Sequence, residues 1–222
     1  ATALVTLARF GVATAFWGRI GDDDAGEKIR SGLLAEGVDC HHLLTDAGRT
    51  SQVAFCVADS KAGRTIFWHR GTARPLSASD LDFGQIGSAS ALLIDGLQAE
   101  AALAAVQSAR QQGVTTVFDG GSWRANSQEL LPWIDHLIVS EKFARQFCDA
   151  RLDAALNGLA TFGAAAVTIT CCSEGSLTCD REGNRFRMPA FPVTAVDTTG
   201  CGDVFHGGYL YGLLEGWPLP EI

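Results

Sequence analysis

Between residues 91 and 170, apolar strands alternate with helices, and this alternation constrains the fold more than any other feature of the chain. The predicted strands read ALLIDG, VTTVFDGG, DHLIVS and AAVTITCC, and the segments between them have helical patterns, such as QAEAALAAVQSARQQG. Strands that are apolar along their whole length are typical of a parallel sheet whose two faces are both covered by helices. The sequence therefore predicts an α/β fold with a central, mostly parallel sheet.

The part of the chain before this alternation has a different pattern. Residues 1–10 and 23–35 are predicted helices, with a predicted strand at 12–19 between them. Two β-rich runs, TSQVAFCVAD and RTIFWHRG, are separated by SKAG, which is the spacing of a β-hairpin. We expect residues 50–70 to form a small β lid that is inserted in a single domain of residues 1–222, since no repeat or linker interrupts the chain.

Composition limits the partners and the compartment. The formal net charge of −8 argues against a nucleic-acid partner, which normally needs a basic surface, and no apolar run is long enough to suggest a membrane partner. The seven cysteines form no C-x-x-C pair, so we expect reduced thiols in a cytoplasmic protein. The Cys40–His42 run lacks the four spaced ligands of a structural zinc site, and we expect no metal there.

The most informative short segment is AVDTTGCGDVFHGGYLYG, at 195–212. The residues Val204, Phe205, Gly208, Tyr211 and Leu214 or Glu215 recur at helical spacing, so Gly200–Gly202 is a turn that leads into a helix. The first N–H groups of a helix have no partners inside the helix, and the helix dipole adds positive charge there. The turn is therefore a predicted anion site, above all for phosphate.

Phosphoryl transfer is the chemistry that fits this turn best. The loop G-x-x-x-x-G-K-[ST] and the dinucleotide motif G-x-G-x-x-G are both absent. Backbone N–H groups of Gly200, Cys201 and Gly202 would stabilise charge on a transferring phosphoryl group, and Asp203 would accept the proton of the attacking hydroxyl. The alternative is that Asp203 only balances the helix dipole.

The segment DTTGCGDVFHGG resembles the C-terminal signature D-T-x-G-A-G-D of the ribokinase-like (PfkB-type) carbohydrate kinases, with Cys201 in place of alanine. GRIGDDDAG matches the G-x-x-G-x-D-x-x-G motif of that family, ATALVTLARFG resembles the end of its N-terminal Gly-Gly-Asn motif, and VTITCCSEGS falls at its nucleotide-contacting turn. The similarity is greatest to the sulfofructose-kinase and ketohexokinase-like branch. It implies a Rossmann-like three-layer α/β/α ribokinase-like fold with a β lid, and a chain that lacks both termini of the family.

The resemblance also implies the roles of particular residues. Asp203 would be the catalytic base, which contacts the sugar, and Gly200, Cys201 and Gly202 would form the anion hole. The nucleotide would contact Thr170, Cys172, Gly175 and Thr198. The sugar would contact Thr2, Arg70 and Arg124, and a monovalent cation such as K⁺ would lie near Asp197 and Thr199. The family's donor is Mg·ATP, and its β lid is often a dimerisation surface.

The sequence departs from the family pattern at two places. The family motif N-x-x-E is SEKF here, with Ser140 and Phe143 in the positions that help to arrange magnesium, and Cys172 replaces a glycine. The sequence also leaves the identity of the acceptor sugar open. Arg70, Arg74 and Arg124 are candidates to meet an acidic group, and WHRGTA resembles a segment of 2-keto-3-deoxygluconate kinases.

We therefore predict an ATP-dependent sugar kinase that phosphorylates a primary hydroxyl of a small ketose or pentose, such as fructose, ribose or sulfofructose. The alternatives are a 2-keto-3-deoxygluconate kinase, a nucleoside kinase, and a non-catalytic protein that binds a sugar or a nucleotide. A homodimer formed through the β lid is expected.

Overall fold

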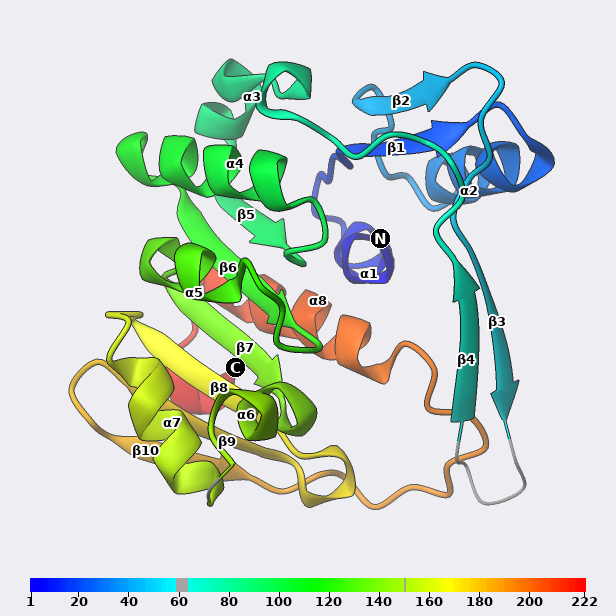
Figure 1. Cartoon of the computed structure of the whole chain (residues 1–222). Helices are drawn as coiled ribbons and strands as arrows, with labels where there is room; N and C mark the ends of the chain where they lie inside the picture. The colour runs from blue at the N-terminus through cyan, green and yellow to red at the C-terminus, as the bar shows by residue number, and fades with distance from the viewer. Residues whose placement is uncertain (59–63, 150) are drawn as a thin grey trace. The chain divides into compact units, whose positions relative to one another are not determined.

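The computed structural model describes residues 1–58, 64–149 and 151–222. The chain divides into two compact units, and each is described by itself (Figure 1). Unit 1 contains residues 1–76 and 193–215, and unit 2 contains residues 77–192 and 216–222. The predicted single domain of 1–222 remains a prediction. The expected SKAG turn lies outside the described residues.

Unit 2 is built on a six-stranded sheet in the order β10-β9-β8-β7-β6-β5. Its strands are β5 (Ala91–Ile94), β6 (Thr115–Gly120), β7 (His136–Ser140), β8 (Ala166–Thr170), β9 (Ser176–Asp180) and β10 (Arg185–Met188). The first four pair in parallel, and β9 and β10 are antiparallel to their neighbours. The predicted alternation is thus confirmed as a mostly parallel sheet.

Helices α4 to α7 cover one face of this sheet (Figure 1). The helical elements of unit 2 are η1 (Ala78–Asp80), α3 (Phe83–Ser88), α4 (Ala99–Gln111), α5 (Ser127–Leu130), η2 (Leu131–Trp133), α6 (Glu141–Phe147), α7 (Leu152–Ala160), η3 (Cys172–Glu174) and η4 (Leu219–Glu221). One apolar core joins sheet and helices, with Phe118, Leu137 and Ile169 from the strands and Phe143 and Leu156 from the helices. This core fixes the carboxyl ends of the strands, where open α/β sheets bind ligands.

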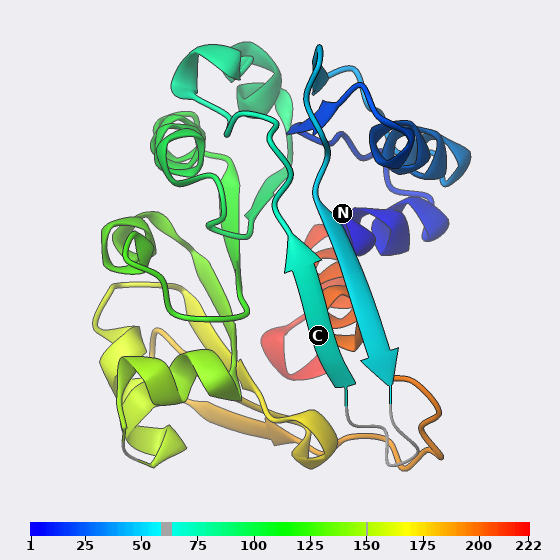
Figure 2. The same ribbon diagram turned by 45° about the vertical axis from the view of Figure 1, so that its right-hand side comes forward.

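Unit 1 contains α1 (Thr2–Arg9), β1 (Gly18–Gly21), α2 (Asp24–Ala35), β2 (Leu43–Asp46), β3 (Val53–Ala58), β4 (Arg64–His69) and α8 (Cys201–Leu214). The strands β1 and β2 form a parallel pair, and β3 and β4 form an antiparallel hairpin, which Figure 2 shows as a long two-stranded ribbon. Helices α1 and α8 lie against each other so closely that a side chain at Gly207 of α8 would collide with Thr6 of α1. The pairing of β3 with β4 confirms the hairpin that was predicted within residues 50–70.

One local prediction was wrong. The strand expected at 12–19 is shorter and later, since β1 covers Gly18–Gly21 and only an isolated bridge joins Ala15 to Asp39. The helix α8 forms as expected, and its buried residues are mostly not those whose spacing predicted it. Val204 is 51% exposed, whereas His206, Gly207, Tyr209, Leu210 and Gly212 are buried. Among these buried residues, Gly207 allows close approach to α1, since a Cβ there would lie 2.6 Å from Thr6 Cβ.

Candidate active site

The turn at the start of α8 has the geometry that the sequence predicts for an anion site. Gly200 caps the helix with a φ of +82°, a left-handed conformation that favours glycine. The N–H of Cys201 donates to the Thr198 carbonyl (3.3 Å), and the N–H of Val204 donates to the Gly200 carbonyl (2.9 Å). In this part of the described chain, the N–H groups of Gly202 and Asp203 have no protein acceptor. These two amides are the donors that the turn offers to a ligand.

The surroundings of the turn suit a reaction that needs access from solvent. Cys201 and Gly202 are exposed, and Asp203 is half-buried. A Cβ at Gly202 would meet nothing within 4 Å, and a Cβ at Gly200 would lie 3.7 Å from the Thr2 methyl group. Thr2, which was predicted to contact the sugar, is therefore next to the anion turn within unit 1.

The preceding residues fold into a short turn of their own. The Asp197 carboxylate accepts the N–H of Thr199 (2.8 Å), and the Thr198 carbonyl accepts from Cys201. The described residues contain no group of three or more His, Cys, Asp and Glu side chains that could hold a metal ion. The predicted roles of Asp197 and Thr199 toward a monovalent cation therefore remain predictions.

The motif GRIGDDDAG connects α2 to the base of the hairpin. Asp23 caps α2 by accepting from the Gly26 N–H (2.9 Å), and it also accepts from the hydroxyl (2.6 Å) and the N–H (3.0 Å) of Ser51. These hydrogen bonds lower the pKa of Asp23, and the bond from the Ser51 hydroxyl has the largest effect. A side chain at Gly21 would collide with the Arg49 carbonyl, so the motif glycine is needed for this close approach.

A second group of polar contacts joins the segment after the hairpin to the end of β2. Arg74 binds the buried Asp46 through its N–H (2.9 Å), Nε (3.0 Å) and Nη2 (2.7 Å), and Arg19 binds the same carboxylate (2.8 Å). The bonds from Arg74, followed by the bond from Arg19, hold the pKa of Asp46 far below its usual range. Arg74 is thus committed to Asp46, which argues against the prediction that it meets an acidic group of the sugar.

The hairpin itself is apolar on both faces. Phe55 pairs with Phe67 on one face and is 69% exposed, while Phe67 is 62% exposed. Ile66 and Trp68 are exposed on the other face. Arg70 shares the side of Trp68, because its guanidinium lies 5.4 Å from the centre of that ring. One face therefore combines an aromatic surface with a cation, and the other presents Phe55 and Phe67 next to the pairs that Val53 forms with His69 and Val57 with Thr65.

In unit 2, the turn after β8 has the shape expected of the nucleotide-contacting turn. Cys172 adopts a φ of 49°, a left-handed value that favours the glycine it replaces. Gly175 has a φ of +88°, and a side chain there would collide with the Met188 carbonyl. The side chain of Thr170, at the end of β8, lies on the opposite side of the strand from that of Cys171.

The two departures from the family motif N-x-x-E are structural residues here. The Ser140 hydroxyl caps α6 by accepting from the Phe143 N–H (3.1 Å), and it donates to the Gly121 carbonyl (3.0 Å). Phe143 is fully buried, with ring centroids 5.3 Å from Trp123 and 5.8 Å from Phe118. The Phe143 side chain cannot contribute to metal binding.

Arg124, a predicted sugar contact, lies in the loop after β6, where its N–H donates to the Ser127 hydroxyl (2.9 Å).

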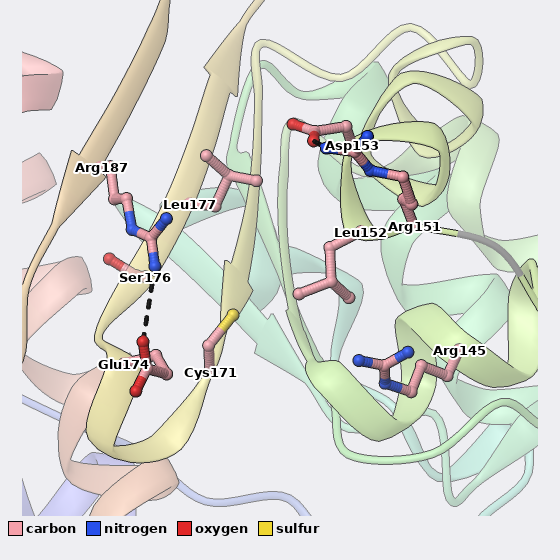
Figure 3. Close-up of a pocket in the computed structure, with 9 residues that line it drawn as sticks. All are labelled: Arg145, Arg151, Leu152, Asp153, Cys171, Glu174, Ser176, Leu177 and Arg187. Atoms are coloured by element: carbon pink, nitrogen blue, oxygen red, sulfur yellow. Dashed lines mark ion pairs between the residues drawn. The ribbon is translucent and has the colours of Figure 1, made fainter.

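Unit 2 contains a cavity of about 540 Å³, and Thr170 is not among its lining residues. Its lining residues are Arg145, Arg151, Leu152, Asp153, Cys171, Glu174, Ser176, Leu177 and Arg187 (Figure 3). Each of its arginines is paired with a carboxylate, which is Glu141 for Arg145, Asp153 for Arg151 and Glu174 for Arg187. The lining itself contains three arginines and two carboxylates, because Glu141 lies outside it, and Asp153 also pairs with Arg185.

Sequence reasoning missed the polar residues that support the candidate site. From the sequence, no role was assigned to Ser51, Asp46 or His206, although His206 lies within the signature segment. The spacing of Asp23 and Ser51 along the chain gives no sign that they meet, because 28 residues separate them. His206 is four residues after Gly202, and that spacing was a usable signal for a bond to the helix backbone.

Comparison with known proteins identifies the family. The model of the pfkB family carbohydrate kinases matches residues 1–222. The chain belongs to this family.

Named relatives agree with this assignment. The chain is 30% identical to the 5-dehydro-2-deoxygluconokinase of Geobacillus thermodenitrificans over 98% of this chain and 72% of the relative. It is 32% identical to the aminoimidazole riboside kinase of Salmonella typhimurium over 94% of this chain and 70% of the relative. The protein is thus a carbohydrate kinase, a phosphotransferase with an alcohol group as acceptor.

Solved structures confirm the predicted ribokinase-like fold. Adenosine kinase from Sinorhizobium meliloti superposes with a TM-score of 0.90 at 22% identity, covering 99% of this chain and 72% of that one. Ribokinase from Arabidopsis thaliana, complexed with ribose and ATP, gives 0.87 at 21% identity, covering 99% of this chain and 75% of that one. Over the part of the chain that the structure describes, no helix is long and apolar enough to cross a membrane.

Proposed function

We propose that Asp203 is the general base of this kinase and that it accepts the proton of a primary hydroxyl of a small sugar as that hydroxyl attacks the γ-phosphate of Mg·ATP. The observation that carries the proposal is the turn at 200–203, where a half-buried carboxylate stands beside two N–H groups that point out of a helix. These N–H groups stabilise the charge that develops on the phosphoryl oxygens. Thr170, Cys172, Gly175 and Thr198 contact the nucleotide, and Thr2 contacts the sugar.

Replacing the base tests this mechanism. In Asp203→Asn the shape and the two N–H donors persist, but the amide cannot accept the proton. We expect kcat to fall by about 10²- to 10⁴-fold while the Kd for the sugar stays unchanged. ADP release and calorimetry measure the two quantities. A variant that keeps near-normal kcat would overturn the assignment of the base.

The acceptor is a small ketose or pentose, and a keto-deoxy sugar acid is the second candidate. Arg70 beside Trp68 offers a cation and an aromatic surface to one substrate, which suits a carboxylate next to a sugar ring face. The name of the Geobacillus relative, 5-dehydro-2-deoxygluconokinase, favours the same class. Arg124 is a second candidate for contact with the acceptor.

A panel of acceptors distinguishes these candidates. ADP release is measured with fructose, ribose, sulfofructose, 2-keto-3-deoxygluconate, 5-dehydro-2-deoxygluconate and adenosine. A sugar acid that exceeds the others in kcat/KM, and whose KM rises about tenfold or more in Arg70→Gln, supports the second candidate. The highest kcat/KM for fructose or ribose supports the first candidate, a small ketose or pentose. Preference for adenosine would show a nucleoside kinase and overturn both.

Two further features accompany this proposal. A monovalent cation bound near Asp197 and Thr199 would stabilise the turn before α8. Comparing turnover in KCl and in NaCl at equal ionic strength tests for this cation.

The protein forms a homodimer through the Phe55 and Phe67 face of the hairpin, since large apolar patches on a surface mark interaction sites. The cytoplasm, which supplies ATP, is the compartment that suits its seven free thiols.

A further inference from the structure

His206 is buried in α8, one turn after the anion turn, and its ring points back toward that turn. Its Nδ1 lies 2.7 Å from the carbonyl oxygen of Gly202. Side chains of a helix project toward the N-terminus, so a residue at this position reaches the carbonyl four residues earlier. A carbonyl oxygen only accepts hydrogen bonds, and therefore Nδ1 carries a hydrogen and donates it.

This bond acts on the peptide group that faces the ligand. The Gly202 carbonyl and the Asp203 N–H belong to the same planar peptide unit. A donor at the oxygen withdraws electron density from the nitrogen, and linked hydrogen bonds strengthen one another by about 10–30% per bond. The Cys201 N–H already donates to Thr198, so the Asp203 N–H is one of the two amides of the turn that remain for a phosphoryl group.

We propose that His206 is a positioning residue for phosphoryl transfer. Its Nδ1–H fixes and polarises the peptide between Gly202 and Asp203, so that this amide is a stronger donor to the phosphoryl oxygens in the transition state. The same bond holds the Cα of Asp203 and thus the direction of its carboxylate. The inference rests on the proposed function of the turn, and it concerns the rate of transfer rather than the binding of substrates.

Three substitutions of His206 separate this role from packing. Asparagine places an N–H group at the same distance from Cβ as Nδ1, whereas glutamine extends its amide further and leucine has no donor. We expect kcat to fall about tenfold in His206→Leu and His206→Gln, with KM for both substrates changed less than about twofold, and to recover to within about threefold of wild type in His206→Asn. The binding of Mg·ADP with aluminium fluoride, which mimics the transferring phosphoryl group, should weaken in parallel with kcat.

Two controls accompany these variants in the complete kinase. Leu210→Ala removes a buried side chain one turn further along α8, so it should lower the melting temperature and leave kcat unchanged at a temperature where it is folded. If His206→Leu does not fold, the comparison of the asparagine and glutamine variants decides the question.

The outcomes keep the two proposals apart. Equal kcat in the asparagine and glutamine variants, or a loss of kcat in Leu210→Ala as large as that in the glutamine variant, would overturn the role of His206. Activity in Asp203→Asn would instead overturn the proposed function of the turn. An inactive Asp203→Asn together with rescue by asparagine at position 206 supports both.

Discussion

At the scale of single residues, two adjacent glycines of α8 have opposite physical roles. A Cβ at Gly207 would lie 2.6 Å from Thr6 Cβ, closer than real carbon contacts, whereas a Cβ at Gly208 would meet nothing within 4 Å. We expect Gly207→Ala to lower the free energy of unfolding by about 1–3 kcal/mol because α1 and α8 must separate. Gly208→Ala should raise it by about 0.5–1 kcal/mol, since alanine favours the helix. Urea denaturation measures both.

Each glycine variant serves as the control for the other, because they change the same side chain in the same helix. If both variants shift the urea midpoint in the same direction, the close packing of α1 on α8 is not what selects Gly207.

At the scale of elements, the two faces of the β3–β4 hairpin should have separate functions. Trp68 and Arg70 share one face, and Phe55 and Phe67 share the other. We expect Phe67→Glu to dissociate the proposed dimer, because a charge would be buried in an apolar contact, with KM for the sugar changed less than about threefold. Trp68→Ala should raise that KM about tenfold and leave the dimer intact. Analytical ultracentrifugation and kinetics measure the two effects.

The paired substitutions distinguish the faces from a general loss of the hairpin. If Phe67→Glu and Trp68→Ala change both the oligomeric state and KM, the hairpin acts as one unit and the division of roles is wrong. A wild-type protein that is monomeric at all concentrations would contradict the dimer itself.

At the scale of the whole molecule, the titratable groups predict loss of stability in acid. The bonds from Arg74 and Ser51 lower the pKa values of Asp46 and Asp23, and burial lowers the pKa of His136. In each case the folded state binds protons less readily than the unfolded state, so stability is complete above the unfolded pKa and decreases as the pH falls. The urea midpoint should begin to fall below about pH 6.5 with His136, and more steeply below about pH 4.5 with the carboxylates.

Asp46→Asn tests the largest of these contributions. Its urea midpoint should be lower than that of the wild type at pH 7, since Arg19 and Arg74 lose their charged partner, and the difference should shrink as the pH falls toward 3. Glu221→Gln, at an exposed position, is the control and should follow the wild type at every pH. A constant difference between Asp46→Asn and wild type would show that the bonds from Arg19 and Arg74 do not depend on the charge of Asp46.

The sequence by itself determined the elements whose physical cause is local. The period of apolar residues predicted β5 to β8 and the helices between them, and glycines with a carboxylate at the start of a helix predicted the anion turn at 200–203. The family motifs added the likeness to carbohydrate kinases. Helix N-termini and strand periodicity depend on neighbours in the chain, so they can be read without the fold.

Only the tertiary structure decided which residues hold these elements in place. The bonds from Ser51 to Asp23 and from Arg74 to Asp46 join residues 28 positions apart, and the need for glycine at position 207 of α8 depends on the close approach of Thr6 in α1. The burial of the Phe143 ring in the core accounts for its departure from the family motif. Such contacts follow from packing between distant segments, which no local pattern in the sequence records.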